Sequence, residues 1–149
     1  RNSQFAFLSC INSDLDRNFI KWSQEGSLYQ NIADTLNITR PQAKQLMFEI
    51  AFGKVQKIHD NIRKIFPKTM LFIDSYKNKN GYKMFSNLLQ RKESEVMIDG
   101  LLYYLFIKGY EVLTVHDSIR VNKSMENIIR KEIKLYFRSI KFKCEIGEK

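Results

Sequence analysis

At 149 residues, 44% hydrophobic and 13% aromatic, the chain is long enough to bury a core as one or at most two compact units, which excludes a disordered tail. Its formal net charge of +9 favours a polyanionic partner such as nucleic acid. Cys10 and Cys144 lack metal-ligand spacing and no apolar run approaches the roughly 20 residues that span a bilayer, so we expect a reduced, cytoplasmic protein without a membrane partner.

The first elements are predicted as follows. Residues 2–11, NSQFAFLSCI, form a short apolar run that suits a buried strand entering a helix. Residues 13–21 predict a short amphipathic helix, and Gly26-Ser27 caps a second helix at Leu28–Leu36.

Residues 39–53, TRPQAKQLMFEIAFG, predict one helix with well-marked ends. Thr39 is a good N-cap, Gln42 completes a capping box, and Pro41 sits in the first turn, where no N–H is missed. Gly53 suits the end of the helix. These boundaries have more sequence support than those of the other elements.

Within this helix, Arg40, Lys44, Phe48 and Phe52 recur every fourth residue and form a chemical stripe. Each step of four turns the side chain by only about 40°, so two cations and two aromatic rings follow one another along one face. The cations suit a polyphosphate near the positive helix N-terminus, and the rings suit a nucleobase. The alternative is that the cations are solvated and both rings pack into a core.

Residues 55–66 are predicted to form the next helix, which ends at Pro67. Its apolar positions share a core face, which leaves His59 exposed as an ordinary surface residue. These positions are Val55, Ile58, Ile62 and Ile65.

A short helix, a turn and a long helix are predicted to follow. Residues 69–76 suit the short helix, and residues 77–81, KNKNG, suit a solvated basic turn. Residues 85–106 predict the long helix, because their apolar side chains recur at helical spacing.

A β-hairpin is predicted next. Residues 110–115 and 119–121 are typical of strands and follow a turn at Lys108-Gly109, which places His116-Asp117-Ser118 at the hairpin tip. A carboxylate there projects from a rigid sheet, as a metal ligand should.

The chain is predicted to close with a helix and a strand. Ser124 caps a helix at residues 125–137, and residues 140–146 predict the closing strand. The expected core face of the helix consists of Ile128, Ile129, Ile133 and Phe137.

Two of these segments resemble motifs of the family A DNA polymerases. The stripe Arg40, Lys44, Phe48 and Phe52-Gly53 is similar to motif B, R-x-x-x-K-x-x-x-F-x-x-x-Y-G, with Phe in place of the usual Tyr. Residues 112–121, VLTVHDSIRV, resemble motif C, which is an apolar strand, His-Asp and a second strand. The related single-subunit phage RNA polymerases share this helix and carry His-Asp-Ser in motif C, so DNA and RNA synthesis both stay open.

Motif A of this family, D-x-S-Q-x-E, is matched less completely. Ser3-Gln4 resembles its middle, and a direct alignment places Arg1 where the metal-binding Asp belongs and Ala6 where the Glu belongs. The alternative, which we favour, is that the Asp lies upstream of Arg1. The chain is then a piece of a longer polypeptide.

Residues 86–95, SNLLQRKESE, resemble the family segment N-x-x-x-Q, which leads into the long palm helix. Gln90 matches the Gln that touches the primer-template minor groove, whereas Asn87 is out of register by one residue. An ordinary surface glutamine is the alternative for Gln90.

The resemblance implies a role for each matched residue. Arg40 and Lys44 would hold the triphosphate, and Lys44 would also be catalytic. Phe48 would pack on the incoming nucleotide, and Phe52 would stack near the templating base. Gly53 would lie beside primer and template.

Motif C would supply the chemistry. Asp117 would be the catalytic carboxylate and a ligand of Mg²⁺, of which phosphoryl transfer needs two ions roughly 3.5 to 4 Å apart. His116 would lie near the primer terminus. Ser118 stands where the DNA polymerases usually carry Glu.

We therefore expect an α+β fold in which a polymerase palm, a small antiparallel sheet with helices, joins a helical fingers subdomain. Residues 1–12 would be the motif A remnant of the palm, residues 13–84 the fingers, and residues 85–149 the palm with motif C. The expected function is template-directed nucleotidyl transfer by a family A DNA-directed DNA polymerase, with Mg²⁺, a DNA primer-template and deoxynucleoside triphosphates. This piece alone should be inactive or nearly so.

A helix-turn-helix DNA reader is the main alternative. Residues 28–50 match that motif, with a turn at residues 37–39 and a second helix rich in polar side chains. A non-catalytic nucleic-acid-binding relative of the polymerases is the other alternative.

Overall fold

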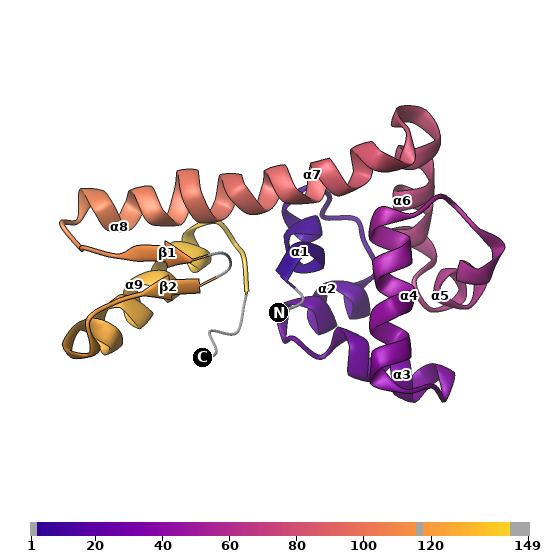
Figure 1. The fold of residues 1–149 in the computed structure, drawn as a ribbon, viewed down its shortest axis with the longest axis horizontal. Coiled ribbons are helices and arrows are strands. Elements are labelled where there is room, and N and C mark those ends of the chain that lie inside the picture. Colours follow the sequence, from indigo (N-terminus) through magenta and orange to yellow (C-terminus); the bar gives the residue numbers. More distant parts are fainter. Residues whose placement is uncertain (1–2, 116–117, 144–149) are drawn as a thin grey trace.

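The computed structural model describes residues 3–115 and 118–143 of the chain. This part is mostly helical and contains a two-stranded antiparallel sheet (Figure 1). The expected α+β class is therefore confirmed as a mostly helical fold with a small sheet, whereas the identification of a palm stays a prediction.

Helices and short 3₁₀ turns make up the first half of the chain. They are α1 (Ser3–Ala6), η1 (Phe7–Cys10), α2 (Arg17–Gln24), α3 (Leu28–Leu36), α4 (Arg40–Phe52), η2 (Lys57–His59), α5 (Asp60–Ile65) and α6 (Pro67–Asn80). The second half contains α7 (Tyr82–Ser94), the π-helical η3 (Glu95–Leu102), α8 (Tyr103–Ile107), β1 (Leu113–Val115), β2 (Ser118–Arg120), the 3₁₀ turn η4 (Lys123–Met125) and α9 (Glu126–Ser139).

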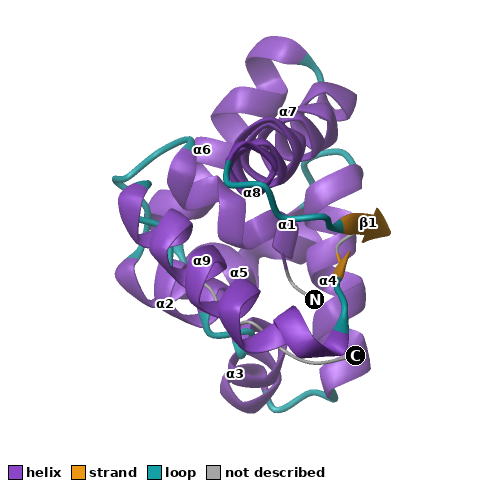
Figure 2. Ribbon diagram, turned by 90° about the vertical axis from the view of Figure 1, so that its left-hand side faces the viewer, coloured by secondary structure: helices purple, strands orange, loops and turns teal. Residues whose placement is uncertain are grey.

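One long helix organises the molecule. It consists of α7, η3 and α8, which follow one another without interruption along the top of Figure 1 and confirm the predicted long helix. One hydrophobic core joins α1–α6 to α7 through Phe85 and Leu89, and a second joins η3 and α8 to α9 through Leu101 and Leu105. Both views place α4 and the β1–β2 hairpin on the same side of this helix (Figures 1 and 2).

The N-terminal segment is helical, so the strand predicted within residues 2–11 is wrong. Phe5 and Leu8, three residues apart, belong to the first core, whereas Phe7 belongs to the second. The Phe7 ring stacks on Phe142 with 5.0 Å between the centroids. A helix places residues three apart on one face, whereas a strand would turn Phe5 and Phe7 to the same side. The helical turns thus direct Phe5 and Leu8 into the first core and Phe7 into the second.

The ends of α4 agree with the sequence prediction. The Gln42 N–H donates to Thr39 Oγ1 at 3.4 Å and the Thr39 N–H donates to Gln42 Oε1 at 2.8 Å, which completes the capping box. The Gly53 N–H donates to the Glu49 carbonyl at 2.7 Å. A Cβ on Gly53 would lie 2.6 Å from that oxygen, so the close approach of the backbone requires glycine there.

Between α4 and α7 the structure differs from the predicted elements. Residues 54–56 are not helical, so Val55 and Ile58 are exposed rather than in the core. α6 continues through the predicted basic turn to Asn80. The chain then turns at Gly81, whose φ of 88° favours glycine.

The C-terminal part contains the two strands of the predicted hairpin. They pair antiparallel with Val115 opposite Ser118, so Ser118 belongs to β2 and its prediction as a tip residue is wrong. β1 begins only at Leu113. In α9, Ile129, Ile133 and Phe137 are buried as expected, but Ile128 is exposed. Residues 140–143 form no strand, and the rest of the predicted closing strand lies outside the described residues.

Candidate functional site

α4 has a buried face and an exposed face. The buried face packs in the first core, where α3 and α7 contact the helix, and consists of Ala43, Met47, Ile50 and Ala51. The exposed face carries the four side chains of the stripe, Arg40, Lys44, Phe48 and Phe52. The structure thus brings together all the residues that the sequence assigned to nucleotide binding.

The two aromatic rings of the stripe lie on the surface. Phe48 is 45% exposed and Phe52 is 39% exposed, and their rings stack with centroids 5.6 Å apart and planes 27° apart. The alternative in which both rings pack into the core is therefore wrong. A contiguous apolar patch on a surface marks an interaction site more often than a single exposed residue does.

The two cations of the stripe are available to a ligand. Neither Arg40 nor Lys44 forms an ion pair with another described residue, and both side chains are exposed. Lys44 Nζ lies 5.7 Å from the centroid of the Phe48 ring, within the range of a cation–π contact. Charge and aromatic surface are therefore adjacent.

The capping box determines how α4 can bind an anion. The amide groups of Thr39 and Gln42 donate to each other's side chains, and Pro41 has no N–H. Backbone donors at this helix end are thus largely occupied, although the positive end of the helix dipole remains. Direct contacts to an anion must come from the side chains of Arg40 and Lys44.

Lys77, which the sequence reasoning missed, holds the other end of α4. Its buried ammonium donates to the carbonyl oxygens of Ile50 and Gly53, the latter at 2.7 Å, and lies over the Phe85 ring. Burial lowers the pKa of Lys77 and the nearby Asp74 opposes that shift. The available signal was the four-residue spacing from Ile73 to Lys77, which continues the buried face of α6.

His59 lies buried beside α4, so the prediction of an exposed histidine is wrong. Its Nε2 is 3.9 Å from Glu49 Oε2 and forms no hydrogen bond within the described part of the chain. Burial, with Arg63 and Lys77, lowers the pKa of His59. The prediction failed because residues 54–56 leave the helical path, which changes the direction in which His59 points.

Of the other predicted site residues, the structure describes Gln90 and Gly53. Gln90 is exposed on α7, and Gly53 ends α4. His116 and Asp117 lie outside the described residues, so their distances to α4 stay a prediction. Among the described residues, no three His, Cys, Asp or Glu side chains gather as a metal site.

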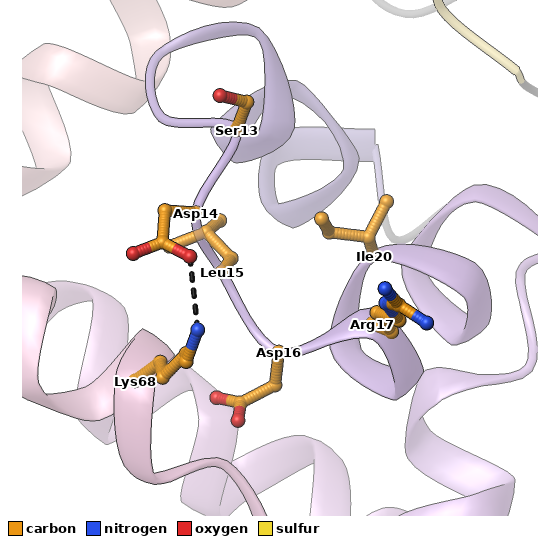
Figure 3. A pocket seen from close by; sticks show the side chains of 7 residues that line it. All are labelled: Ser13, Asp14, Leu15, Asp16, Arg17, Ile20 and Lys68. Atoms are coloured by element: carbon orange, nitrogen blue, oxygen red, sulfur yellow. Dashed lines mark hydrogen bonds and ion pairs between the residues drawn. The ribbon is translucent and has the colours of Figure 1, made fainter.

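Two pockets lie away from the stripe. The pocket in Figure 3, of about 460 Å³, lies between residues 13–17 and α6. There Lys68 Nζ pairs with Asp14 at 2.9 Å, Asp16 accepts from the Thr69 N–H at 2.8 Å, and the Asp16 N–H donates to Thr69 Oγ1 at 3.1 Å. These carboxylates tie the loop before α2 to the start of α6, which is a structural role.

The larger hollow, of about 1100 Å³, lies between the long helix and the hairpin. Its lining includes the exposed apolar side chains Tyr103, Phe106 and Leu113. Neither of these two pockets includes a residue of α4.

Comparison with known proteins gives no match, whether with protein-family models, curated proteins or solved structures. In the described part of the chain, no helix combines the length and apolar character needed to cross a membrane. The resemblance to polymerase motifs therefore rests on the motif residues themselves.

Proposed function

We propose that the exposed face of α4 binds a deoxynucleoside triphosphate, and that the chain is the fingers and palm region of a family A DNA-directed DNA polymerase within a longer cytoplasmic polypeptide. The observation that carries this proposal is the exposure of Arg40, Lys44, Phe48 and Phe52 in one line on a helix whose other face is buried. Ordinary packing does not account for this line.

The order of the stripe suits a nucleotide. The Arg40 guanidinium presents a planar fork that matches phosphate oxygens, and the Lys44 ammonium adds a point charge one turn further on. The Phe48 and Phe52 rings offer faces on which a base stacks. Since Arg40 and Phe52 are 12 residues apart, the stripe is about 18 Å long at 1.5 Å per residue.

The roles in catalysis follow from the resemblance. Lys44 would stabilise the negative charge that develops on the phosphates during transfer, and Arg40 would orient them. Asp117 would supply carboxylate oxygens, the ligands that Mg²⁺ prefers, and the metal would activate the primer hydroxyl. His116, Gln90 and Gly53 would contact the primer-template.

Equilibrium binding of a deoxynucleoside triphosphate with Mg²⁺ tests the proposal. Hydrogen bonds to charged groups contribute about 1.5–3 kcal/mol, so Arg40→Gln and Lys44→Gln should each weaken binding by about tenfold or more. Lys134→Gln is the matched control, because Lys134 is exposed on α9 in the other half of the molecule. Equal binding by all three variants and the parent chain would contradict the proposal.

A helix-turn-helix reader is the second candidate. α3 packs against α4 across a short turn in which Asn37 has a φ of 54°, and the N-terminal half of α4 exposes Arg40, Lys44 and Gln45. Selection from a random pool of duplexes separates the candidates. One strongly preferred duplex would support the reader, whereas a polymerase should show little sequence preference.

A non-catalytic polymerase relative would bind nucleotide or DNA through the same surface. It would give no primer extension, even in a protein that includes the flanking sequence. Primer extension that is lost in Asp117→Asn would exclude this alternative.

A further inference from the structure

We infer that the exposed face of α9 is a docking surface for an amphipathic helix of a partner protein that carries acidic and apolar side chains. The surface, called the α9 surface below, consists of Ile128, Lys131, Leu135 and Arg138. It lies in the half of the molecule that does not contain α4 (Figure 1), so the inference does not depend on the proposed nucleotide-binding role of α4.

The two apolar residues of the α9 surface are Ile128, which is 44% exposed, and Leu135, which is 50% exposed. They are seven residues apart and therefore lie about two turns apart on nearly the same line along the helix. The opposite face of α9 packs in the second core through Ile129, Ile133 and Phe137. α9 thus has more apolar surface than the core covers.

Lys131 and Arg138 form a second line beside the apolar one. Each follows an apolar residue of the surface by three positions, which is about 60° around the helix. Both side chains are exposed, and neither forms an ion pair with another described residue. A surface in which such cations alternate with apolar side chains is complementary to one that carries carboxylates and apolar side chains.

The acidic residues of α9 have other partners. Glu126 accepts from the Arg130 guanidinium at 3.0 Å, and Glu132 accepts from Lys108 at 2.6 Å and from the Tyr104 hydroxyl at 2.8 Å. The carboxylates of α9 therefore do not neutralise the two cations of the α9 surface. The contacts of Lys108 and Tyr104 also fix α9 to α8, so the surface is held in shape before a partner arrives, which reduces the entropic cost of binding.

A helix is the partner element that matches the spacing of this surface. With Ile128 at position a of a heptad, Lys131 falls at d, Leu135 at the next a and Arg138 at the next d. A helix packed alongside would place apolar side chains against the a positions and glutamate or aspartate against the d positions. α9 is 14 residues long, or about 21 Å, so the contact is smaller than a standard interface and should be transient.

A second copy of the chain fits the α9 surface less well. In a parallel pair of α9 helices, Lys131 would face Lys131 and Arg138 would face Arg138, and like charges at close range repel. In an antiparallel pair, Ile128 would face Arg138, which leaves the cation without a partner. Nucleic acid phosphates would pair with the cations but would leave Ile128 and Leu135 without apolar contacts.

Binding of a designed helical peptide of three heptads tests the inference. The peptide has leucine at each a position and glutamate at each d position, and a fluorescent label reports its binding by anisotropy. Lys131→Glu and Arg138→Glu should each weaken binding about tenfold or more, because each substitution places a carboxylate against a carboxylate. Leu135→Ala should weaken binding about fivefold, because it removes an apolar contact.

A second peptide, with lysine in place of each glutamate, gives the converse test. It should not bind the parent chain, but it should bind the double variant Lys131→Glu/Arg138→Glu, because the charges on both sides are exchanged. A variant that failed to fold could not gain this binding. If the double variant bound neither peptide while remaining folded, the inference would be overturned.

Control variants lie on α6, which packs in the first core. Leu71 is 68% exposed and Lys79 is exposed, so Leu71→Ala and Lys79→Glu should bind the acidic peptide like the parent chain. Losses in these controls as large as those in the α9 variants would overturn the inference, as would no binding of the acidic peptide to the parent chain. Circular dichroism establishes that each variant is folded.

Two further measurements detect other occupants of the α9 surface. A dimer of the parent chain in sedimentation velocity that is lost in Leu135→Ala would assign the surface to a second copy and overturn the inference. Binding of a DNA duplex that is weakened by Lys131→Glu but not by Leu135→Ala, together with no binding of the acidic peptide, would assign the surface to nucleic acid. A monomer that binds the acidic peptide through both Lys131 and Leu135 supports the inference.

Discussion

The buried ammonium of Lys77 on α6 donates a hydrogen bond to the carbonyl oxygen of Gly53 at the end of α4, with 2.7 Å between Nζ and O. The same ammonium donates to Ile50 in the last turn of α4. The last carbonyls of a helix lack partners within the helix, and a cation there also complements the negative end of the helix dipole. A residue 24 positions further along the chain thus fixes the end of the helix that carries the stripe.

Lys77→Met should destabilise the fold. The substitution keeps the length and apolar stem of the side chain but leaves the carbonyls of Ile50 and Gly53 without their donor, which costs about 1–3 kcal/mol. Urea unfolding measures this change. Lys79→Met is the control, because Lys79 is exposed on the same helix. Equal stability of the two variants would show that the buried ammonium does not hold α4.

His59 should make stability depend on pH. Its pKa lies below the ordinary value of 6.5 because burial, Arg63 and Lys77 disfavour the imidazolium, while Glu49 and Asp74 oppose them more weakly. As the pH falls below about 6.5, the unfolded chain binds this proton before the folded chain does. The stability present above pH 6.5 is therefore lost as the pH falls toward the lowered pKa.

The comparison of parent and His59→Gln unfolding between about pH 7.5 and pH 5 measures this effect. The parent should lose more stability than the variant over this range. The other histidine and all carboxyl groups are common to both proteins, so their contributions cancel. Parallel pH profiles would contradict a buried, neutral His59.

Gly100 should tolerate no side chain, because the long helix passes close to α9 there. A Cβ would lie 1.7 Å from the hydroxyl oxygen of Tyr136, which itself donates to the Val96 carbonyl at 3.2 Å. Overpacking of this kind costs about 1–3 kcal/mol, which thermal unfolding of Gly100→Ala would measure. Tyr136→Phe in the same chain removes the closest atom and should recover part of the loss. If the effects of Gly100→Ala and Tyr136→Phe on stability were additive, this contact would be contradicted.

The aromatic rings of the stripe should contribute little to stability. Phe48→Ala and Phe52→Ala should each cost about 1 kcal/mol or less, since both rings are exposed and lose mainly their mutual stacking and, for Phe48, the contact with Lys44. Phe85→Ala is the contrast, because that ring is fully buried and its loss should cost about 3–5 kcal/mol. Urea unfolding of the three variants compares them directly. If Phe48→Ala and Phe85→Ala lost equal stability, the Phe48 ring would belong to the core rather than to the surface.

The sequence predicts the residues at which α4 begins and ends because their capping interactions are local, although Lys77 also binds the last carbonyls of the helix. Thr39, Gln42 and Gly53 act within one turn of their own positions, so their residue types suffice. Exposure of Phe48 and Phe52 depends instead on what packs against each face of the helix. Spacing alone does not contain that information.

The predictions that were wrong all concern residues whose position depends on tertiary contacts. Phe5 and Phe7 belong to different cores, which no local pattern in residues 2–11 reveals. Lys77 lies in a polar run that is typical of a solvated turn, but its ammonium reaches carbonyls on another helix. His59 follows a stretch that leaves the helical path after Gly53. Short apolar or polar runs leave such choices open until the fold is known.

The site assigned to nucleotide binding is most directly tested by photo-crosslinking of a deoxynucleoside triphosphate with a photoreactive base, followed by mass spectrometry of the peptides. We predict that the label attaches to the peptide that contains Phe48 and Phe52, that unmodified triphosphate competes with it, and that Lys44→Gln reduces it. Nucleotide binding by α4 would be contradicted if the label attached to another peptide, such as one that lines the pocket at Asp14 and Lys68. It would also be contradicted if unmodified triphosphate did not reduce the labelling.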